Sequence, residues 1–187
     1  MAENNHSTQH AEWLEYLVDQ GATLDNHGIL DFGQPNDEIE TTNAQSNIIA
    51  NLDQIGILEV KGEDARQFLQ GQITADLDLV SPELGTLGCY VNLQGRAVAS
   101  FRLIQLSDQQ SNDGIPRFLL SMHNSLIPIV MERLQKYIVF SKAELKDVSS
   151  EWIKLGLSGA EAYPFIQSRF ESSIPSGETI NNKNSPI

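Results

Sequence analysis

Hydrophobic and polar positions follow two different periods in the middle of the chain. Ile55 to Val60 is an apolar run of strand length, and Gly62 interrupts the extended pattern. Helical spacing then appears in the positions Ala65, Phe68, Leu69 and Gln72. Acidic Glu63 and Asp64 favour a helix start, and Gly71 stands where a helix ends in a left-handed turn. The pattern predicts a buried strand followed by a helix that packs back on it.

The elements predicted next complete one domain. Extended runs at 87–93 and 97–106 are separated by the turn sequence Gln94-Gly95-Arg96, and a further strand covers 117–122. A second helix spans 126–137, with Pro128 in its first turn, and 141–148 alternates as a closing strand. The order β-α-β-β-β-α-β is close to an α+β fold of the ferredoxin-like split βαβ type, with one hairpin enlarged.

The two ends of the chain carry weaker patterns. Residues 12–18 have helical spacing, whereas 33–47 is polar and is predicted as a loop. Residues 152–159 have the form of a strand ended by glycine, 160–170 resembles a helix, and a polar tail follows. We expect an acidic N-terminal arm with one short helix at 1–50, an α+β domain at 51–150, and the start of an incomplete second unit at 151–187. The chain is then a fragment of a longer protein.

Composition narrows the class of protein. Of the 187 residues 40% are hydrophobic, which suffices for a globular core. No run approaches the roughly 20 apolar residues of a membrane span, and the N-terminus lacks the pattern of a secretory signal. The single cysteine, Cys89, cannot form an internal disulfide. These features predict a cytoplasmic protein that does not bind a membrane.

Charge is distributed unevenly along the chain. Residues 1–50 hold nine acidic residues and no Lys or Arg, while the remaining residues carry 16 acidic against 12 basic ones. The net charge of −13 makes direct, tight binding to nucleic acid unfavourable, because phosphate backbones are bound by Lys and Arg. The acidic arm has two interpretations: a solvated extension, or a docking segment for a basic partner.

Three motifs in order resemble the YgfZ family of folate-binding proteins, which are relatives of the glycine-cleavage T-protein, an aminomethyltransferase. They are Leu69-Gln70-Gly71-Gln72-Ile73-Thr74-Ala75-Asp76, then Gln94-Gly95-Arg96 ahead of Phe101-Arg102-Leu103, and Leu134-Gln135-Lys136-Tyr137-Ile138-Val139-Phe140-Ser141-Lys142. The resemblance covers the N-terminal portion of such proteins. It implies a protein that binds tetrahydrofolate and supports iron–sulfur enzymes and, through them, tRNA modification.

Departures from the family pattern limit what the resemblance implies. The family's Lys-Gly-Cys-Tyr-x-Gly-Gln signature is absent, and Gly88-Cys89-Tyr90 matches only three of its letters, so we interpret Cys89 as an ordinary half-buried thiol. The catalytic Asp of the transferase branch falls on Ala99 or Ser100, and neither side chain can act as a carboxylate. We therefore expect no aminomethyltransferase activity.

Six residues are candidates for contact with folate, namely Ile55, Gln70, Gln72, Asp76, Arg96 and Arg102. Ile55 replaces an aromatic residue that the family places against folate, and the two glutamines can present amides to a pterin edge. Arg96 and Arg102, six positions apart and hence on one face of a strand, can pair with the glutamate tail of folate. Surface caps, helix termination and solvated arginines are the structural alternatives for these positions.

The sequence contains few other candidate sites. The four histidines are scattered, which predicts no metal site, and Tyr137 to Lys142 is expected to form a helix-to-strand corner of the core. Two alternatives to folate binding stay open: a non-catalytic protein-interaction module on the same scaffold, and a truncated fragment without a complete folate cavity.

Overall fold

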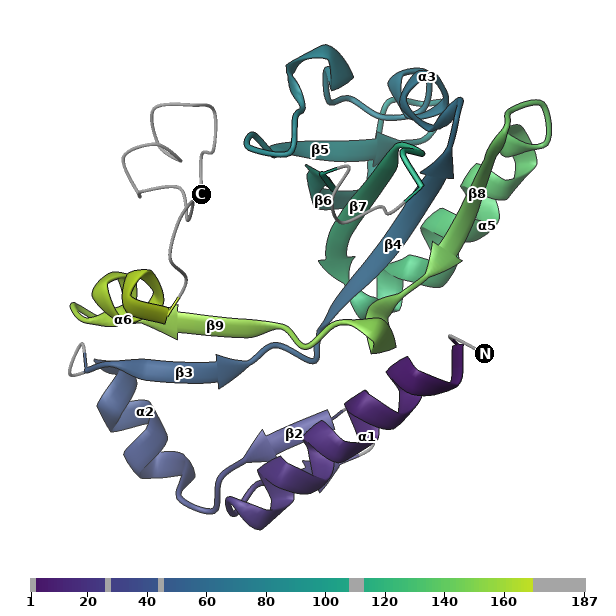
Figure 1. Ribbon diagram of the computed structural model, residues 1–187. Helices are drawn as coiled ribbons and strands as arrows, with labels where there is room; N and C mark the ends of the chain where they lie inside the picture. Colours follow the sequence, from purple (N-terminus) through teal and green to yellow (C-terminus); the bar gives the residue numbers. More distant parts are fainter. Residues whose placement is uncertain (1–2, 26–27, 44–45, 108–112, 170–187) are drawn as a thin grey trace. The chain divides into compact units, whose positions relative to one another are not determined.

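The computed structural model describes residues 3–25, 28–43, 46–107 and 113–169, which form two compact units (Figure 1). Among the described residues, the first unit joins those up to Gln54 with 150–169, and the second runs from Ile55 to Ser149. The mixed α/β composition with antiparallel sheets agrees with the prediction. The predicted polar tail from residue 170 lies outside the described residues.

The first unit contains two small antiparallel sheets and three helices. Its elements are α1 (Glu3–Asp19), β1 (Thr23–Asp25), β2 (Gly28–Asp31), α2 (Pro35–Asn43), β3 (Ile48–Asn51), β9 (Leu155–Ser158) and α6 (Ala162–Arg169). Strand β1 pairs with β2, and β3 pairs with β9 from Ile48 opposite Ser158 to Asn51 opposite Leu155.

The prediction of an N-terminal arm with only one short helix is therefore wrong. The polar stretch predicted as a loop contains α2, where Pro35 begins the helix and Asp37 and Glu38 occupy its first turn, as the helix dipole favours. The strand predicted to open a separate second unit is β9, which pairs instead with β3. A pairing between segments about a hundred positions apart leaves no local signal in the sequence.

The second unit is a five-stranded antiparallel sheet with two main helices. Its elements are β4 (Ile55–Gly62), α3 (Ala65–Gln70), β5 (Thr86–Val91), β6 (Ala97–Gln105), β7 (Arg117–His123), α5 (Ile127–Ile138) and β8 (Ala143–Asp147). Short 3₁₀ turns η1 (Leu77–Leu79), η2 (Asn124–Leu126) and η3 (Ser149–Glu151) connect or follow them. The sheet order is β5-β6-β7-β4-β8. Each predicted element of this unit is present within a few residues of its expected bounds.

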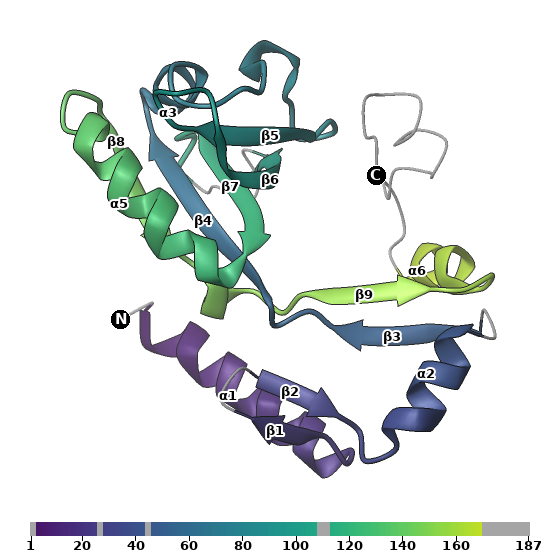
Figure 2. The ribbon, with the colours of Figure 1, turned by 180° about the vertical axis from the view of Figure 1, so that it is seen from behind.

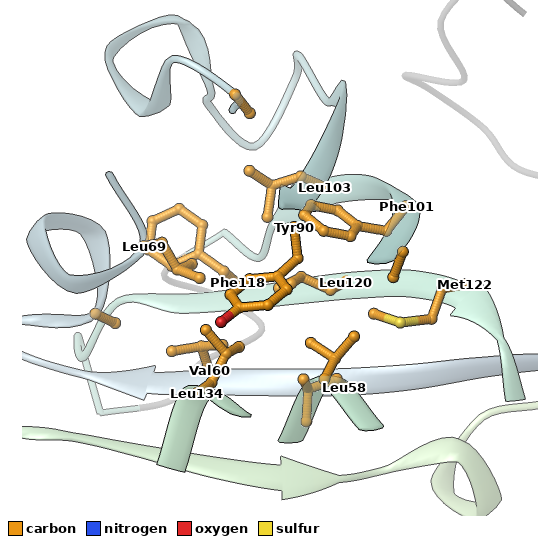
Figure 3. Packing of buried hydrophobic residues seen from close by; sticks show 14 of the residues in the cluster. Leu58, Val60, Leu69, Tyr90, Phe101, Leu103, Phe118, Leu120, Met122 and Leu134 are labelled. Atoms are coloured by element: carbon orange, nitrogen blue, oxygen red, sulfur yellow. The ribbon is translucent and has the colours of Figure 1, made fainter. Parts of the chain in front are cut away.

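The core of the second unit lies on one face of its sheet. Leu58 and Val60 of β4 stand opposite Leu120 and Phe118 of β7, and all four are fully buried. Figure 3 shows these side chains packed with others from the sheet and from both helices. The helices contribute Ala65, Phe68, Leu69, Ile127, Val130 and Leu134. Because α3 and α5 bury their apolar faces in one cluster, both cover the same face of the sheet.

Spacing explains why α5 packs as it does. Its buried residues Ile127, Val130 and Leu134 recur at helical intervals, and Pro128 falls in the first turn, where its missing N–H needs no partner. Seen from behind, the helix runs alongside β4 and β8 (Figure 2). Burying each of these side chains stabilises the fold by roughly 1.5–3 kcal/mol relative to exposure.

Arg66 ties α3 to the chain that follows it. Its guanidinium donates to the carbonyl oxygens of Leu77 and Val80 and to Gln105 Oε1, the last at 2.6 Å. The same group lies 5.3 Å from the centroid of the Phe118 ring. These contacts place the segment through η1 against the helix and β6.

Two details of α3 differ from the prediction. Gly71 follows the helix at φ −84°, in the right-handed region, because the chain continues its helical hydrogen bonds into the next turn rather than ending in a left-handed cap. Asp64 makes no side-chain cap bond; its Oδ2 accepts from the backbone N–H of Lys142 at 2.8 Å. Glu63 accepts from Lys142 Nζ, also at 2.8 Å, and this hydrogen bond raises the pKa of the lysine. The acidic pair thus anchors the α5–β8 turn.

Gly62 should be intolerant of any side chain. It has φ +151°, pairs with Ala143, and a Cβ there would lie 2.1 Å from the carbonyl oxygen of Lys142. We expect Gly62→Ala to lower the free energy of unfolding by at least about 2 kcal/mol more than Gly95→Ala. Gly95 also has a positive φ, +75°, but a Cβ added there would have nothing within 4 Å, so Gly95→Ala measures the cost of backbone strain without a steric clash. Urea unfolding of both variants checks this; equal losses would contradict it.

Candidate functional site

The face of the second unit's sheet opposite its helices carries a row of polar side chains. In β6, Ser100 and Arg102 alternate with the buried Phe101 and Leu103. The strand register places Arg102 opposite Ser121 of β7 on one side and Leu87 of β5 on the other. Alternation with the core residues directs these side chains away from α3 and α5.

A pocket of about 510 Å³ lies on this face. Its lining includes the side chains of Ile55, Thr74, Leu87, Cys89, Ser100, Arg102, Ser121 and His123. They come from β4, β5, β6 and β7 and from the segment after α3. The volume falls in the range of small-molecule sites, about 300–1,000 Å³.

Backbone contacts hold the rim of the pocket. Thr74 Oγ1 accepts from the backbone N–H of Cys89 at 2.9 Å, and the Thr74 N–H donates to the Cys89 carbonyl at 3.0 Å. His123 Nδ1 lies 2.8 Å from Ser125 Oγ and accepts from the Ser125 N–H at 3.3 Å. A neutral His123 ring that accepts at Nδ1 carries its proton on Nε2.

The chemistry of the pocket suits an anionic ligand with a flat apolar part. Ile55 and Leu87 offer apolar surface, Arg102 supplies a guanidinium, and none of the lining residues is Asp or Glu. The absence of a lining carboxylate contrasts with the net charge of −13 of the chain. An anion entering the pocket therefore meets no acidic side chain in the lining itself.

The structure brings two of the six predicted folate residues together. Ile55 and Arg102 both line the pocket. Gln70 instead accepts the backbone N–H of Leu77 at 2.7 Å through its Oε1 and lines a separate depression beside α3. Asp76 caps η1 by accepting from the Asp78 N–H.

Gln72 and Arg96 also lie outside the lining of this pocket. Arg96 belongs to the turn before β6, where its backbone N–H donates to Asn92 Oδ1 at 2.9 Å. The ladder between β5 and β6 shifts register between Tyr90 and Val91. Strand alternation therefore does not extend to Arg96, and it gives no support for a strand face shared with Arg102.

The two positions considered for a transferase-type aspartate differ in environment. Ala99 is buried in the core with 3% of its surface exposed, whereas Ser100 is exposed and lines the pocket. Only Ser100 is thus placed to meet a ligand here. Its hydroxyl has an ordinary pKa far above that of a carboxyl group, so it does not replace the aspartate as a base or charge partner.

Sequence reasoning missed several pocket residues. Cys89 is half-buried, as expected of an ordinary thiol, but it also lines the pocket. Ser121 and His123 follow by alternation once the register of β7 is known, and only the fold supplies that register. The Tyr137 to Lys142 block forms the expected corner between α5 and β8, but Phe140 is 93% exposed and does not belong to the core.

A partly buried ion pair lies further along the same sheet face. Glu59, at 5% exposure, accepts from Arg117 Nε at 2.7 Å and from a second nitrogen of the same guanidinium. Lys61 and Asp113 each lie a few positions from one member of this pair, and Lys61 Nζ is 2.6 Å from Asp113 Oδ2. This hydrogen bond lowers the pKa of the aspartate. Charged groups thus cover one end of β4, while the pocket lies at the other end.

Two features are absent from the described residues. No helix among them is both long enough and apolar enough to pass through a bilayer. Within the same residues, no cluster of three or more His, Cys, Asp and Glu side chains is arranged to hold a metal ion.

No protein-family model matches the chain. It is 30% identical to the tRNA-modifying protein YgfZ of Photobacterium profundum over 122 residues, which is 65% of this chain and 34% of that protein. It is 36% identical to the protein of the same name from Edwardsiella ictaluri, over 56% of this chain and 29% of that protein. The chain thus spans about a third of the length of these curated relatives.

Among solved structures, the chain is similar to the glycine cleavage system aminomethyltransferase T from Bartonella henselae. The TM-score is 0.66 at 16% identity, covering 82% of this chain and 41% of that one. At this identity the likeness concerns the fold alone. Together, the comparisons confirm the predicted resemblance to the YgfZ family and its T-protein relatives.

Removing one partner of the buried ion pair should destabilise the protein strongly. Arg117→Met leaves the Glu59 carboxylate buried without its guanidinium, and we expect a loss of about 3 kcal/mol in the free energy of unfolding. The double variant Glu59→Gln with Arg117→Met should lose less, because no buried charge remains unpaired. Denaturant unfolding of Arg117→Met and of the double variant measures the difference; a loss in the double variant as large as that in Arg117→Met would contradict the expectation.

Proposed function

Because this chain is a relative of the YgfZ proteins, we propose that it binds tetrahydrofolate in the sheet-face pocket and supports iron–sulfur enzymes and, through them, tRNA modification. The observation that carries the proposal is the pocket itself: an arginine and apolar side chains with no lining carboxylate, in a strongly acidic chain. A reduced folate combines a flat pteridine with an anionic glutamate tail. Its two ends therefore match the two kinds of surface in the pocket.

We assign separate roles to the candidate residues. Ile55 and Leu87 contact the pteridine, and Arg102 pairs with a carboxylate of the glutamate tail, for which a guanidinium provides paired donors. Gln70 and Asp76 act by holding η1 in place through the Leu77 and Asp78 amides. Gln72 and Arg96 stay secondary candidates, reached only by parts of a ligand that extend beyond the pocket.

The proposed function does not include aminomethyl transfer. That reaction needs a carboxylate to handle the proton and positive charge at the folate nitrogen. In this pocket the corresponding lining position holds Ser100, which has no carboxylate. Binding without this group makes the protein an accessory factor rather than a transferase. We propose that it acts in the cytoplasm and that iron–sulfur enzymes are its partners.

We also assign the second unit to the ferredoxin-like class. Without the edge strand β5, the order β6-β7-β4-β8 has β7 between β4 and β6, and β4 between β7 and β8. Each helix then lies within a split βαβ unit, and both helices cover one face. This arrangement supports the assignment and leaves the opposite face available to a ligand.

Arg102 should contribute strongly to folate affinity. We expect full-length Arg102→Gln to bind tetrahydrofolate about tenfold more weakly than the original protein, because a charge-assisted hydrogen bond to a carboxylate is lost. Isothermal titration calorimetry under anaerobic conditions measures both affinities.

Arg133→Gln is the matched control, since α5 lies on the opposite face of the sheet. It should keep the original affinity. Thermal unfolding of both variants establishes that they are folded. No heat of binding from the folded original protein would refute the folate proposal, and equal loss in both variants would refute the placement of the site.

Incubation with tetrahydrofolate and an aminomethyl donor should yield no methylenetetrahydrofolate above the protein-free background. The physical reason is the lack of a carboxylate at position 100. A glycine-cleavage T-protein assayed in parallel is the positive control. Turnover by this protein would show that another residue supplies the missing group.

A further inference from the structure

Strand β3 of the first unit has one open edge among the described residues, since it pairs there with β9 alone. The Leu52 N–H donates to the Lys154 carbonyl at 2.9 Å, one position beyond the paired residues Asn51 and Leu155. In an antiparallel ladder, residues alternate between bonding the partner and facing away from it. Ile49 and Asn51 therefore direct their N–H and C=O groups to the open edge.

A groove of about 510 Å³ runs along this edge. All four residues of β3 line it, together with 29–32, which include most of β2, and one face of α2 formed by Asp37, Glu38, Thr41 and Thr42. Within the described chain β2 also has a single neighbour, β1. The groove thus lies between two strands that each have one unoccupied side.

Apolar surface is exposed beside the groove. Leu30 is 65% exposed and Ile49 is 63% exposed, and both line it with Ile29, Phe32 and Ile48. An exposed strand edge presents unpaired N–H and C=O groups with which another chain can pair. The side chains that lie along an added strand would find both apolar and acidic contacts here.

Negative charge on the groove has few compensating cations within the unit. Asp31, Asp37 and Glu38 line it, and residues 1–54 contain no Lys or Arg. Positions 1–54 and 150–169 together hold twelve acidic residues against Lys154 and Arg169, a net charge of −10 out of −13. A partner at this edge gains most if it is cationic.

We propose that an extended, Lys- and Arg-rich segment of another protein binds along β3 as an added strand. Its backbone pairs with Ile49 and Asn51, its apolar side chains contact the groove, and its cations lie near Asp37 and Glu38. The open backbone edge favours a strand over a helix, because a helix satisfies its own N–H and C=O groups. This surface belongs to the first unit and does not depend on the folate proposal.

The probe for this proposal is a fluorescein-labelled peptide of alternating Lys and Val, titrated into the full chain while anisotropy is recorded. We expect saturable binding that weakens as NaCl is raised. Alternating Glu and Val should give no binding, and a Lys–Val peptide interrupted by proline should bind at least about tenfold more weakly, because proline removes the N–H needed for pairing.

Two variants locate the site. Ile49→Pro removes an N–H that faces the open edge without removing a bond to β9, and should weaken peptide binding by about tenfold. Ile49→Ala keeps that N–H and is the matched control, with a smaller loss from the apolar contact alone. Asp37→Asn should reduce both the affinity and its dependence on salt.

Several outcomes would overturn the proposal. They are the absence of saturable binding, equal binding of the Glu–Val or proline-interrupted peptide, and unchanged affinity in a folded Ile49→Pro variant. Helix formation by the bound peptide, seen by circular dichroism, would also overturn it. Size-exclusion chromatography that shows a dimer from which the peptide is excluded would assign the edge to a second copy of this chain instead.

Discussion

The pairing of β4 with β7 and β8 sets the arrangement of the second unit, because β4 is buried on both of its faces. Leu58 and Val60 face the helix-covered core, while Ile57 and Glu59 are buried on the other side. A shift of one residue in this register would exchange the two sets and drive a carboxylate into the apolar core. The same register places Ile55 opposite His123, so the pocket exists only because the core is aligned in this way.

Charge is distributed between the two units in a way that separates their proposed roles. The acidic side chains concentrate in the first unit, where cations are nearly absent from the sequence. In the second unit Glu63 pairs with Lys142 and Glu59 pairs with Arg117, and no acidic residue lines the pocket. One surface therefore suits an anion and the other a cation, despite the overall negative charge.

Local pattern is enough to place some of the candidate side chains, whereas the position of others depends on contacts with their neighbours. Arg102 is a candidate in the sequence because its guanidinium suits a carboxylate, and its alternation with buried Phe101 and Leu103 places it in the pocket lining. Gln70 and Asp76 looked equally suitable, yet their side chains bond to the Leu77 and Asp78 amides. Nothing in sequence spacing distinguishes a side chain that reaches a ligand from one that reaches a nearby backbone group.

By itself, the sequence determined the elements of the second unit, their order, and the apolar faces of α3 and α5, because these depend on periodicity within a few residues. It also determined the concentration of acidic residues near the N-terminus. Tertiary structure alone decided that β9 pairs with β3 and that His123 and Cys89 line one pocket. These contacts join residues far apart in the chain, and their registers result from packing of the whole unit rather than from any local preference.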